Sequence, residues 1–183
     1  ALQGKKVVVV SSGDPGVFAM ASAIFEVIDK KNISRDDLPI VVLPGITALL
    51  AASARLGAPI GHDFCVINLS DNLKSWDILK SRVIAAAKAD FVIAFYNPRS
   101  KSRKNQLSEI YDVLRKNCKS DRIVIYANSI STESEAVFET TLSEADASSV
   151  SMKTLVIIGS SSTKKIRNTG YIYTPRYSGV EKN

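Results

Sequence analysis

Four consecutive valines, Val7 to Val10, precede the small-residue sequence S-S-G-D-P-G, and this stretch constrains the fold more than any other. A run of β-branched apolar side chains is typical of a strand buried on both faces, as in a parallel sheet covered by helices. Asp14 and Pro15 then favour a helix start, because aspartate caps helices and proline fits their first turn. The stretch therefore predicts a strand, a tight loop and a helix N-terminus. Taken alone, it is more simply interpreted as an ordinary βα connection than as a ligand site.

Strands and helices alternate along most of the remaining sequence. Apolar runs predict strands at 39–43, 64–69, 91–95, 122–126, 154–158 and 170–174, with an extended segment at 135–142. Helical spacing of apolar residues predicts helices at 17–30, 49–54, 76–88 and 106–116. After Asn128 the predicted strands follow one another without long helices between them. The sequence therefore predicts an α/β protein of two lobes, residues 1–61 with a parallel sheet and residues 62–183 with a mixed sheet.

Composition narrows the classes of function without selecting one. The chain has 24 Lys and Arg against 18 Asp and Glu, a net charge of +6 that suits an anionic ligand. A nucleic-acid-binding domain is the weaker alternative, because the charge is scattered and only 7% of residues are aromatic. The single histidine, His62, and the distant Cys65 and Cys118 argue against a metal site and a disulfide framework. With no apolar run of membrane-spanning length, we expect a cytoplasmic protein with reduced cysteines and no membrane partner.

Four of the predicted strands end in unusual loops: S-S-G-D-P-G, P-G-I-T-A, Y-N-P-R-S-K-S-R and G-S-S-S-T. If the strands are parallel, these loops share one side of each lobe and form a cleft for a small ligand such as a nucleoside. A Walker lysine and a complete G-x-G-x-x-G are missing from the sequence, which favours a ligand without phosphates. The cations Arg99, Lys101, Arg103 and Lys104 form either a solvated face or a site for carboxylates or phosphates. No order of Ser, His and Asp or of Cys and His supports a nucleophile, so no catalytic residue is assigned.

These loops, together with H-D-F-C-V-I-N-L-S-D and Y-T-P-R, make the chain resemble the tetrapyrrole methylase family over almost its whole length. The resemblance is greatest to the members that methylate C17 of the corrinoid precursors precorrin-3B or cobalt-factor III in cobalamin biosynthesis. It implies the two-lobed fold of that family, with S-adenosylmethionine bound between the lobes, and a homodimer. The family also opens with a strand and a Gly-Pro-Gly loop, which this sequence does not show before Lys6.

The resemblance also implies which residues contact the cofactor and the substrate. The cofactor residues that it implies are Ser12, Gly13, Asp14, Val17, Thr47, Ala48, Asn97, Asn128 and Ser129. The acetate and propionate arms of the tetrapyrrole would pair with Arg99, Lys101, Arg103 and Arg55. The implied reaction is methyl transfer to a ring carbon with ring contraction, and it needs alignment of donor and acceptor more than a covalent nucleophile. The missing Gly-Pro-Gly loop keeps an alternative open, a fragment of the same fold that binds a tetrapyrrole or nucleoside without turnover.

Overall fold

The computed structural model describes residues 1–177, and the chain divides into two compact units, Ala1–Leu50 (unit 1) and Ala51 onward (unit 2). The sequence predicted a division after residue 61 instead. The earlier division follows from β1 (Gly57–Ala58), which pairs in parallel with β8 (Ile172–Tyr173) and so ties the segment after α2 (Ala48–Leu56) to unit 2. The last residues of the predicted second lobe, 178–183, lie outside the described part.

Unit 2 is built on a mixed sheet, as the sequence predicted. Within the described residues its strand order is β2-β3-β6-β4-β5. The strands are β2 (Phe64–Asn68), β3 (Val92–Tyr96), β4 (Ile123–Asn128), β5 (Ala136–Thr141) and β6 (Thr154–Ile158). Strand β2 runs parallel to β3, whereas β6 is antiparallel to both β3 and β4, and β5 is antiparallel to β4. Strands β2, β3 and β4 therefore run in one direction and end at one edge of the sheet.

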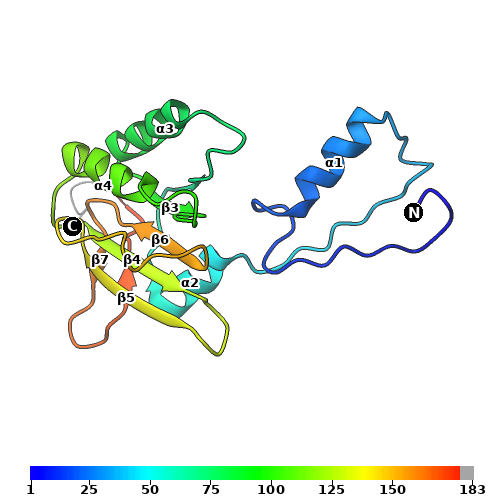
Figure 1. Cartoon of the computed structure of the whole chain (residues 1–183). Helices are drawn as coiled ribbons and strands as arrows, with labels where there is room; N and C mark the ends of the chain where they lie inside the picture. Colours follow the sequence, from blue (N-terminus) through cyan, green and yellow to red (C-terminus); the bar gives the residue numbers. More distant parts are fainter. Residues whose placement is uncertain (178–183) are drawn as a thin grey trace. The chain divides into compact units, whose positions relative to one another are not determined.

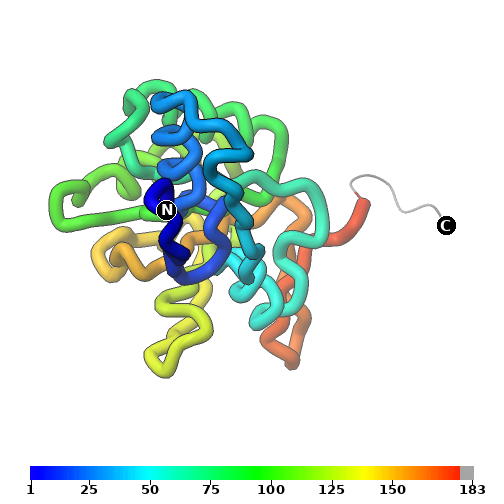
Figure 2. Tube along the Cα trace, turned by 90° about the vertical axis from the view of Figure 1, so that its right-hand side faces the viewer, coloured from blue at the N-terminus to red at the C-terminus, as the bar shows by residue number. Residues whose placement is uncertain are grey.

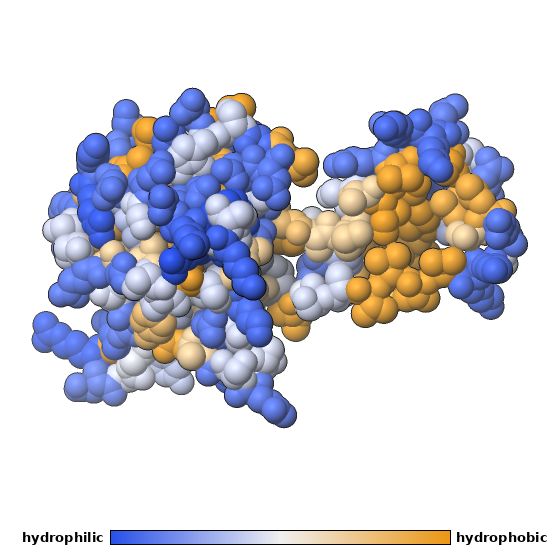
Figure 3. Space-filling model, in the orientation of Figure 1, coloured by the Kyte–Doolittle hydropathy of each residue, from blue (hydrophilic) through white to orange (hydrophobic). Residues whose placement is uncertain are grey.

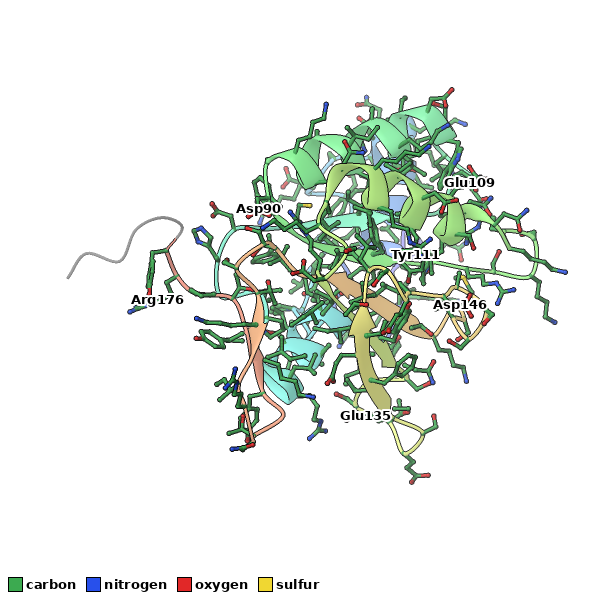
Figure 4. The ribbon with its side chains drawn as sticks, turned by 90° about the vertical axis from the view of Figure 1, so that its left-hand side faces the viewer. Asp90, Glu109, Tyr111, Glu135, Asp146 and Arg176 are labelled. Carbon is green, nitrogen blue, oxygen red and sulfur yellow. The ribbon has the colours of Figure 1, made fainter. Side chains whose placement is uncertain are left out.

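The central strands are apolar throughout because both of their faces are buried. All five residues of β6 are buried, whereas the edge strand β5 has exposed positions. Helices α3 (Trp76–Lys88) and α4 (Gln106–Asn117) lie side by side on one face of the sheet (Figure 1). Figure 4 shows Tyr111 of α4 at the centre of unit 2, where its hydroxyl donates to the hydroxyl of Tyr126 at 2.9 Å. Burial raises the pKa of the Tyr111 hydroxyl, so this buried pair stays neutral at physiological pH.

A small second sheet completes unit 2, with the order β1-β8-β7 among the described residues. Strand β7 (Lys164–Lys165) pairs with β8 in antiparallel fashion. The turn between β7 and β8 and the turn between β4 and β5 extend from the same end of the unit (Figures 1 and 2). Gly57 allows β1 to pair with β8, because it adopts φ +120° and lies directly against the backbone of β8.

Unit 1 differs from the prediction. The predicted strands at Val7 to Val10 and at 39–43 are extended, but neither is paired with another strand within residues 1–50. Their side chains are exposed, with Val8 at 81%, Val10 at 87% and Val41 at 80%, and Figure 3 shows hydrophobic surface gathered on unit 1. The valines provide β-propensity, but a strand also needs a neighbouring strand for its hydrogen bonds.

The first helix also begins later than predicted. Helix α1 (Met20–Lys30) starts after Ala19, whose side chain cannot cap it. Asp14 and Pro15 instead belong to a turn in which the N–H of Val17 donates to the carbonyl of Asp14 at 3.2 Å. The expected helix cap at Asp14 is therefore wrong, because its carboxylate binds N–H groups of loops.

Replacing Gly57 by alanine should lower the free energy of unfolding of unit 2 by about 1–3 kcal/mol, the usual cost of a strained backbone conformation. An added Cβ would also meet the carbonyl oxygen of Ile172 at 2.9 Å. The measurement is urea unfolding followed by the fluorescence of Trp76, the chain's one tryptophan. Gly170→Ala is the control, because Gly170 has φ +77° but no atom within 4 Å of its Cβ position. Equal losses in the two variants would show that the contact with β8 contributes nothing.

Hydrogen exchange should separate the two units. The amides of Val7 to Val10 have no strand partner within unit 1, so they should exchange at close to the rate of an unfolded peptide. The amides of β3, β4 and β6 should be protected by several orders of magnitude, as expected for the core of a sheet. Mass spectrometry of peptides after short labelling pulses measures both. Protection of the valine segment equal to that of β6 would contradict the unpaired conformation.

Candidate functional site

In unit 1, the carboxylate of Asp14 joins the S-S-G-D-P-G loop to the P-G-I-T-A loop. Its Oδ1 accepts a hydrogen bond from the N–H of Gly16 at 2.8 Å, and its Oδ2 accepts one from the N–H of Gly45 at 3.0 Å. The loops approach so closely that a Cβ on Gly45 would lie 2.0 Å from the carbonyl oxygen of Gly13. Glycine is therefore required at position 45. The structure brings together two loops that were predicted from the sequence to bind the same ligand.

Both hydrogen bonds stabilise the charged form of Asp14. The pKa of its carboxyl is lowered below the ordinary value, first by the N–H of Gly45 and second by the N–H of Gly16. A depressed pKa in the folded state means that the stabilisation is present above the pKa of the unfolded chain. It is lost as the pH falls through the lowered pKa. At neutral pH the link between the loops is therefore fully formed.

The other predicted cofactor residues of unit 1 flank this link. Ser12 precedes Gly13 on the exposed side of the first loop. Thr47 lies close to Gly13, since a Cβ on Gly13 would come 3.7 Å from the Thr47 Cα atom. Ala48 follows as the first residue of α2, and Val17 closes the turn that starts at Asp14. The candidate set of unit 1 is thus one cluster of small residues around a charged carboxylate.

In unit 2, an asparagine stands at the end of each of the three strands that run in the same direction. These are Asn68 at the end of β2, Asn97 directly after β3 and Asn128 at the end of β4. The Nδ2 of Asn97 donates to the Oδ1 of Asn68 at 3.1 Å. Asn68 was not among the sequence candidates, although its place at the end of a predicted strand, as for Asn97, was a signal that could have identified it.

The backbone is strained where two of these strands end. Asn97 has φ +51° and Ser129 has φ +47°, values that side chains other than glycine seldom adopt. Asn97 also precedes Pro98, and a residue before proline strongly prefers an extended conformation. Strained residues of this kind gather at ligand-binding sites, because the surrounding structure must hold them. The strain therefore supports Asn97 and Ser129 as members of a site.

Asn128 and Ser129 are held by the segment before β6. The Oδ1 of Asn128 accepts from the hydroxyl of Thr154 at 3.2 Å, and the N–H of Ser129 donates to the carbonyl of Lys153 at 2.9 Å. Strand β6 stands between β3 and β4 in the sheet, so it also separates Asn97 from Asn128. The structure brings all three asparagines to one edge but pairs only Asn68 with Asn97.

The four predicted substrate cations have different environments. Lys101 is exposed at the tip of its loop, and within the described residues its ammonium group has no recorded partner. Arg99 donates to main-chain carbonyls, including that of Ser148 at 2.6 Å. Arg103 is buried and donates to two other carbonyls. Arg55 of α2 is exposed and pairs with Glu135 at 2.7 Å.

Glu135 connects Arg55 to the loop that follows Asn128 and Ser129. Its carboxylate accepts from the N–H of Ser131 at 2.7 Å, in addition to the ion pair with Arg55. The pKa of Glu135 is lowered, first by the N–H of Ser131 and second by the hydrogen bond from Arg55. Arg55 thereby lies beside the β4–β5 loop. Two of the predicted cofactor residues, Asn128 and Ser129, stand where this loop begins.

One predicted loop lies elsewhere. Because β6 is antiparallel to β3 and β4, the G-S-S-S-T loop after it lies at the opposite edge of the sheet from the asparagines. There the N–H and hydroxyl of Ser161 donate to Asp90, whose carboxylate also pairs with Arg122 at 2.5 Å. Figure 4 shows Asp90 and Asp146 on opposite sides of Tyr111. The expectation that the loops of each lobe share one side is therefore wrong for the G-S-S-S-T loop, because its strand is antiparallel to β3 and β4.

The residues that the structure describes, 1–177, offer neither a metal-binding cluster nor a membrane-spanning helix. Within them, no three His, Cys, Asp or Glu side chains are grouped so that they could hold a metal ion. Among the helices of this part, none has the length and apolar character needed to cross a membrane.

Comparison with known proteins identifies close relatives. The family model of Tetrapyrrole (Corrin/Porphyrin) Methylases matches residues 1–146. A precorrin-3B C(17)-methyltransferase from Sinorhizobium sp. is 47% identical, with 100% of this chain and 73% of the relative aligned. A probable cobalt-factor III C(17)-methyltransferase from Salmonella typhimurium is 39% identical over 94% of this chain and 70% of its own length.

A solved structure agrees with these sequences. The crystal structure of the methyltransferase CobJ superposes with a TM-score of 0.88 and 46% sequence identity. The match covers 94% of this chain and 71% of that one.

Titration of the Gly45 amide should report the link made by Asp14. We expect the proton shift of the Gly45 N–H to follow a single titration with a midpoint below 3.8, the ordinary pKa of aspartate. The carboxylate deshields this proton, so the shift should move upfield as the pH falls. Asp14→Asn should abolish the titration. The control Asp36→Asn should leave it unchanged, because Asp36 is exposed in the loop before residues 39–43. A midpoint above 3.8 would contradict the geometry of the two loops.

Proposed function

Because the chain belongs to the family of tetrapyrrole (corrin/porphyrin) methylases, we propose that it transfers a methyl group from S-adenosylmethionine to C17 of a corrinoid precursor. The precursor is precorrin-3B or cobalt-factor III, and ring contraction accompanies the transfer in cobalamin biosynthesis. The observation that carries this proposal is the 47% identity, along the whole chain, to a precorrin-3B C(17)-methyltransferase.

The chemistry agrees with the side chains of the site. S-adenosylmethionine, when bound, supplies a methyl group already activated on a sulfonium, and the electron-rich ring carbon is the nucleophile. The chain then has to bind, orient and exclude water rather than attack. Alignment of two reactants accounts for roughly 7–11 kcal/mol of a barrier. The absence of a nucleophile next to a base among the sequence candidates is consistent with this division of labour.

We assign the cofactor to the two sets of residues already described. In unit 1 the set is Ser12, Gly13, Asp14, Val17, Thr47 and Ala48, and in unit 2 it is Asn97, Asn128 and Ser129. Each oxygen of the Asp14 carboxylate accepts one N–H and keeps a lone pair, so it can accept a further hydrogen bond from a ribose hydroxyl or an amino group. The small residues around it leave main-chain atoms accessible to a ligand. These features fit a nucleoside.

The carboxylate arms of the substrate would meet the cations in different ways. Lys101 and Arg55 are exposed, so they are our candidates for direct contact. Arg99 uses one nitrogen of its guanidinium group, Nη1, to donate to main-chain carbonyls. Arg103 is buried, so we propose that it affects the substrate only through the loop that it holds.

A non-catalytic binding module is the second candidate. The unpaired conformation of the valine segments favours it, because the loops of unit 1 then lack the support of a sheet. We also propose that the protein is a cytoplasmic homodimer, on the strength of the family resemblance. Light scattering coupled to size-exclusion chromatography measures the oligomeric state, and a monomer at micromolar concentration would contradict the dimer.

The decisive experiment is incubation of the protein with methyl-labelled S-adenosylmethionine and a mixture of corrinoid precursors, followed by mass spectrometry. We expect a product that carries one additional labelled methyl group. Binding of S-adenosylhomocysteine measured by calorimetry, without a labelled product, would favour the binding module. No binding and no product from a folded sample would reject both candidates.

Asp14→Ala should raise the Kd for S-adenosylhomocysteine by about tenfold or more. Such a loss is expected because a hydrogen bond to a charged carboxylate is stronger than one between neutral groups. Calorimetry provides the measurement, and Asp36→Ala is the matched control because it removes a carboxylate from the same unit outside the cluster. Equal affinities in the wild type and in Asp14→Ala would remove Asp14 from the site.

A further inference from the structure

Arg103 occupies an unusual position for a cation predicted to bind substrate. It lies in the loop between β3 and α4, and only 8% of its surface is exposed. Its Nη1 donates to the carbonyl of Leu69 at 3.2 Å and to the carbonyl of Asn97 at 3.0 Å. Its Nη2 lies 3.6 Å from the sulfur of Met152, and its Nε lies 3.9 Å from a carboxylate oxygen of Asp71. The guanidinium is therefore occupied by contacts within the protein.

These partners come from three separate connections. Leu69 and Asp71 follow β2, Asn97 follows β3, and Met152 precedes β6. One planar fork thus joins the three segments at the sheet edge where the asparagines stand. Arginine suits this role because its donors point in fixed directions, whereas lysine offers a single point charge.

Asn97 is the residue that needs support. Its φ of +51° lies in the left-handed region, which asparagine adopts more readily than most residues, but Pro98 disfavours it because a residue before proline prefers an extended conformation. Arg103 binds its carbonyl, and Asn68 accepts from its side-chain amide at 3.1 Å. The two contacts fix both the backbone and the amide of Asn97. Without Arg103, the carbonyls of Leu69 and Asn97 would lose a charged donor, and the left-handed conformation of Asn97 would lose one of its restraints.

We propose that Arg103 is a positioning residue, which holds Asn97 in the conformation required for cofactor binding. This inference rests on the proposed function, because Asn97 is assigned to S-adenosylmethionine. It separates Arg103 from the neighbouring exposed cation Lys101, which can reach the tetrapyrrole directly. Loss of Arg103 should weaken binding of the cofactor, whereas loss of a substrate-binding cation should weaken binding of the tetrapyrrole.

The test compares Arg103→Lys and Arg103→Ala with a matched variant at the opposite sheet edge. Arg122 is equally buried, at 8% exposure, and also binds a carboxylate and a main-chain carbonyl. Arg122→Lys therefore provides the control for destabilisation alone. We expect Arg103→Lys to raise the Kd for S-adenosylhomocysteine at least severalfold and Arg103→Ala at least tenfold. Arg122→Lys and Lys104→Ala should stay within twofold of the wild type.

Two results would overturn the proposal. One is an unchanged Kd for S-adenosylhomocysteine in folded Arg103→Lys, and the other is a rise in the KM for the tetrapyrrole with the cofactor Kd unchanged. Should Arg103→Ala not fold, the lysine variant decides alone, because it keeps the charge and the stem and removes only the fork.

A nuclear magnetic resonance readout keeps this inference separate from the proposed function. The side-chain amide signals of Asn97 and the backbone signals of Leu69 and Met152 should shift in Arg103→Lys but not in Arg122→Lys. This comparison needs no ligand. If the wild type binds no S-adenosylhomocysteine, the proposed function fails while these shifts still test the placement of Asn97. Unmoved Asn97 signals in Arg103→Lys would reject the positioning role.

Discussion

The insertion of β6 between β3 and β4 is the constraint on which unit 2 depends. Its backbone is paired in antiparallel fashion with both neighbours, and all of its side chains are buried. Strands β3 and β4 are thereby made to run in the same direction, and their ends reach one edge about 10 Å apart, twice the usual spacing between strands. Asn97 and Asn128 owe their common edge to this pairing. Asn68 reaches the same edge through the parallel pairing of β2 with β3 and there contacts Asn97.

A buried arginine binds the loops at each of the two edges where the strands of the sheet end. At one edge Arg103 binds main-chain carbonyls and lies near Asp71; at the other Arg122 binds a carbonyl and pairs with Asp90. Each arginine ties a loop to neighbouring strands and is itself almost completely buried. Each arginine binds a residue with positive φ, Asn97 at +51° and Asp90 at +60°, but only Asn97 is among the predicted cofactor residues. The difference arises from strand direction, which decides which loop each arginine meets.

The sequence predicted what depends on nearby residues. Helices expected at 76–88 and 106–116 are found as Trp76–Lys88 and Gln106–Asn117, because apolar spacing and capping are local properties. Strand direction is not local, so the G-S-S-S-T loop was expected at the wrong edge, and the contacts of Asn68 and Arg103 were not foreseen. In unit 1 the valines predicted a strand by propensity, but Val7 to Val10 do not form one, because a strand needs a paired neighbour that propensity does not supply.

The extended valine segments of unit 1 have a consequence for behaviour in concentrated solution. Within residues 1–50 their N–H and C=O groups have no strand partner, and Val7 to Val10 contain neither charge nor proline. Such a segment is a template for pairing with an identical segment of another molecule. Lys5 and Lys6 directly precede it, and like charges brought together by in-register stacking repel. The two lysines therefore act as gatekeepers that oppose fibril-like association of the exposed valines.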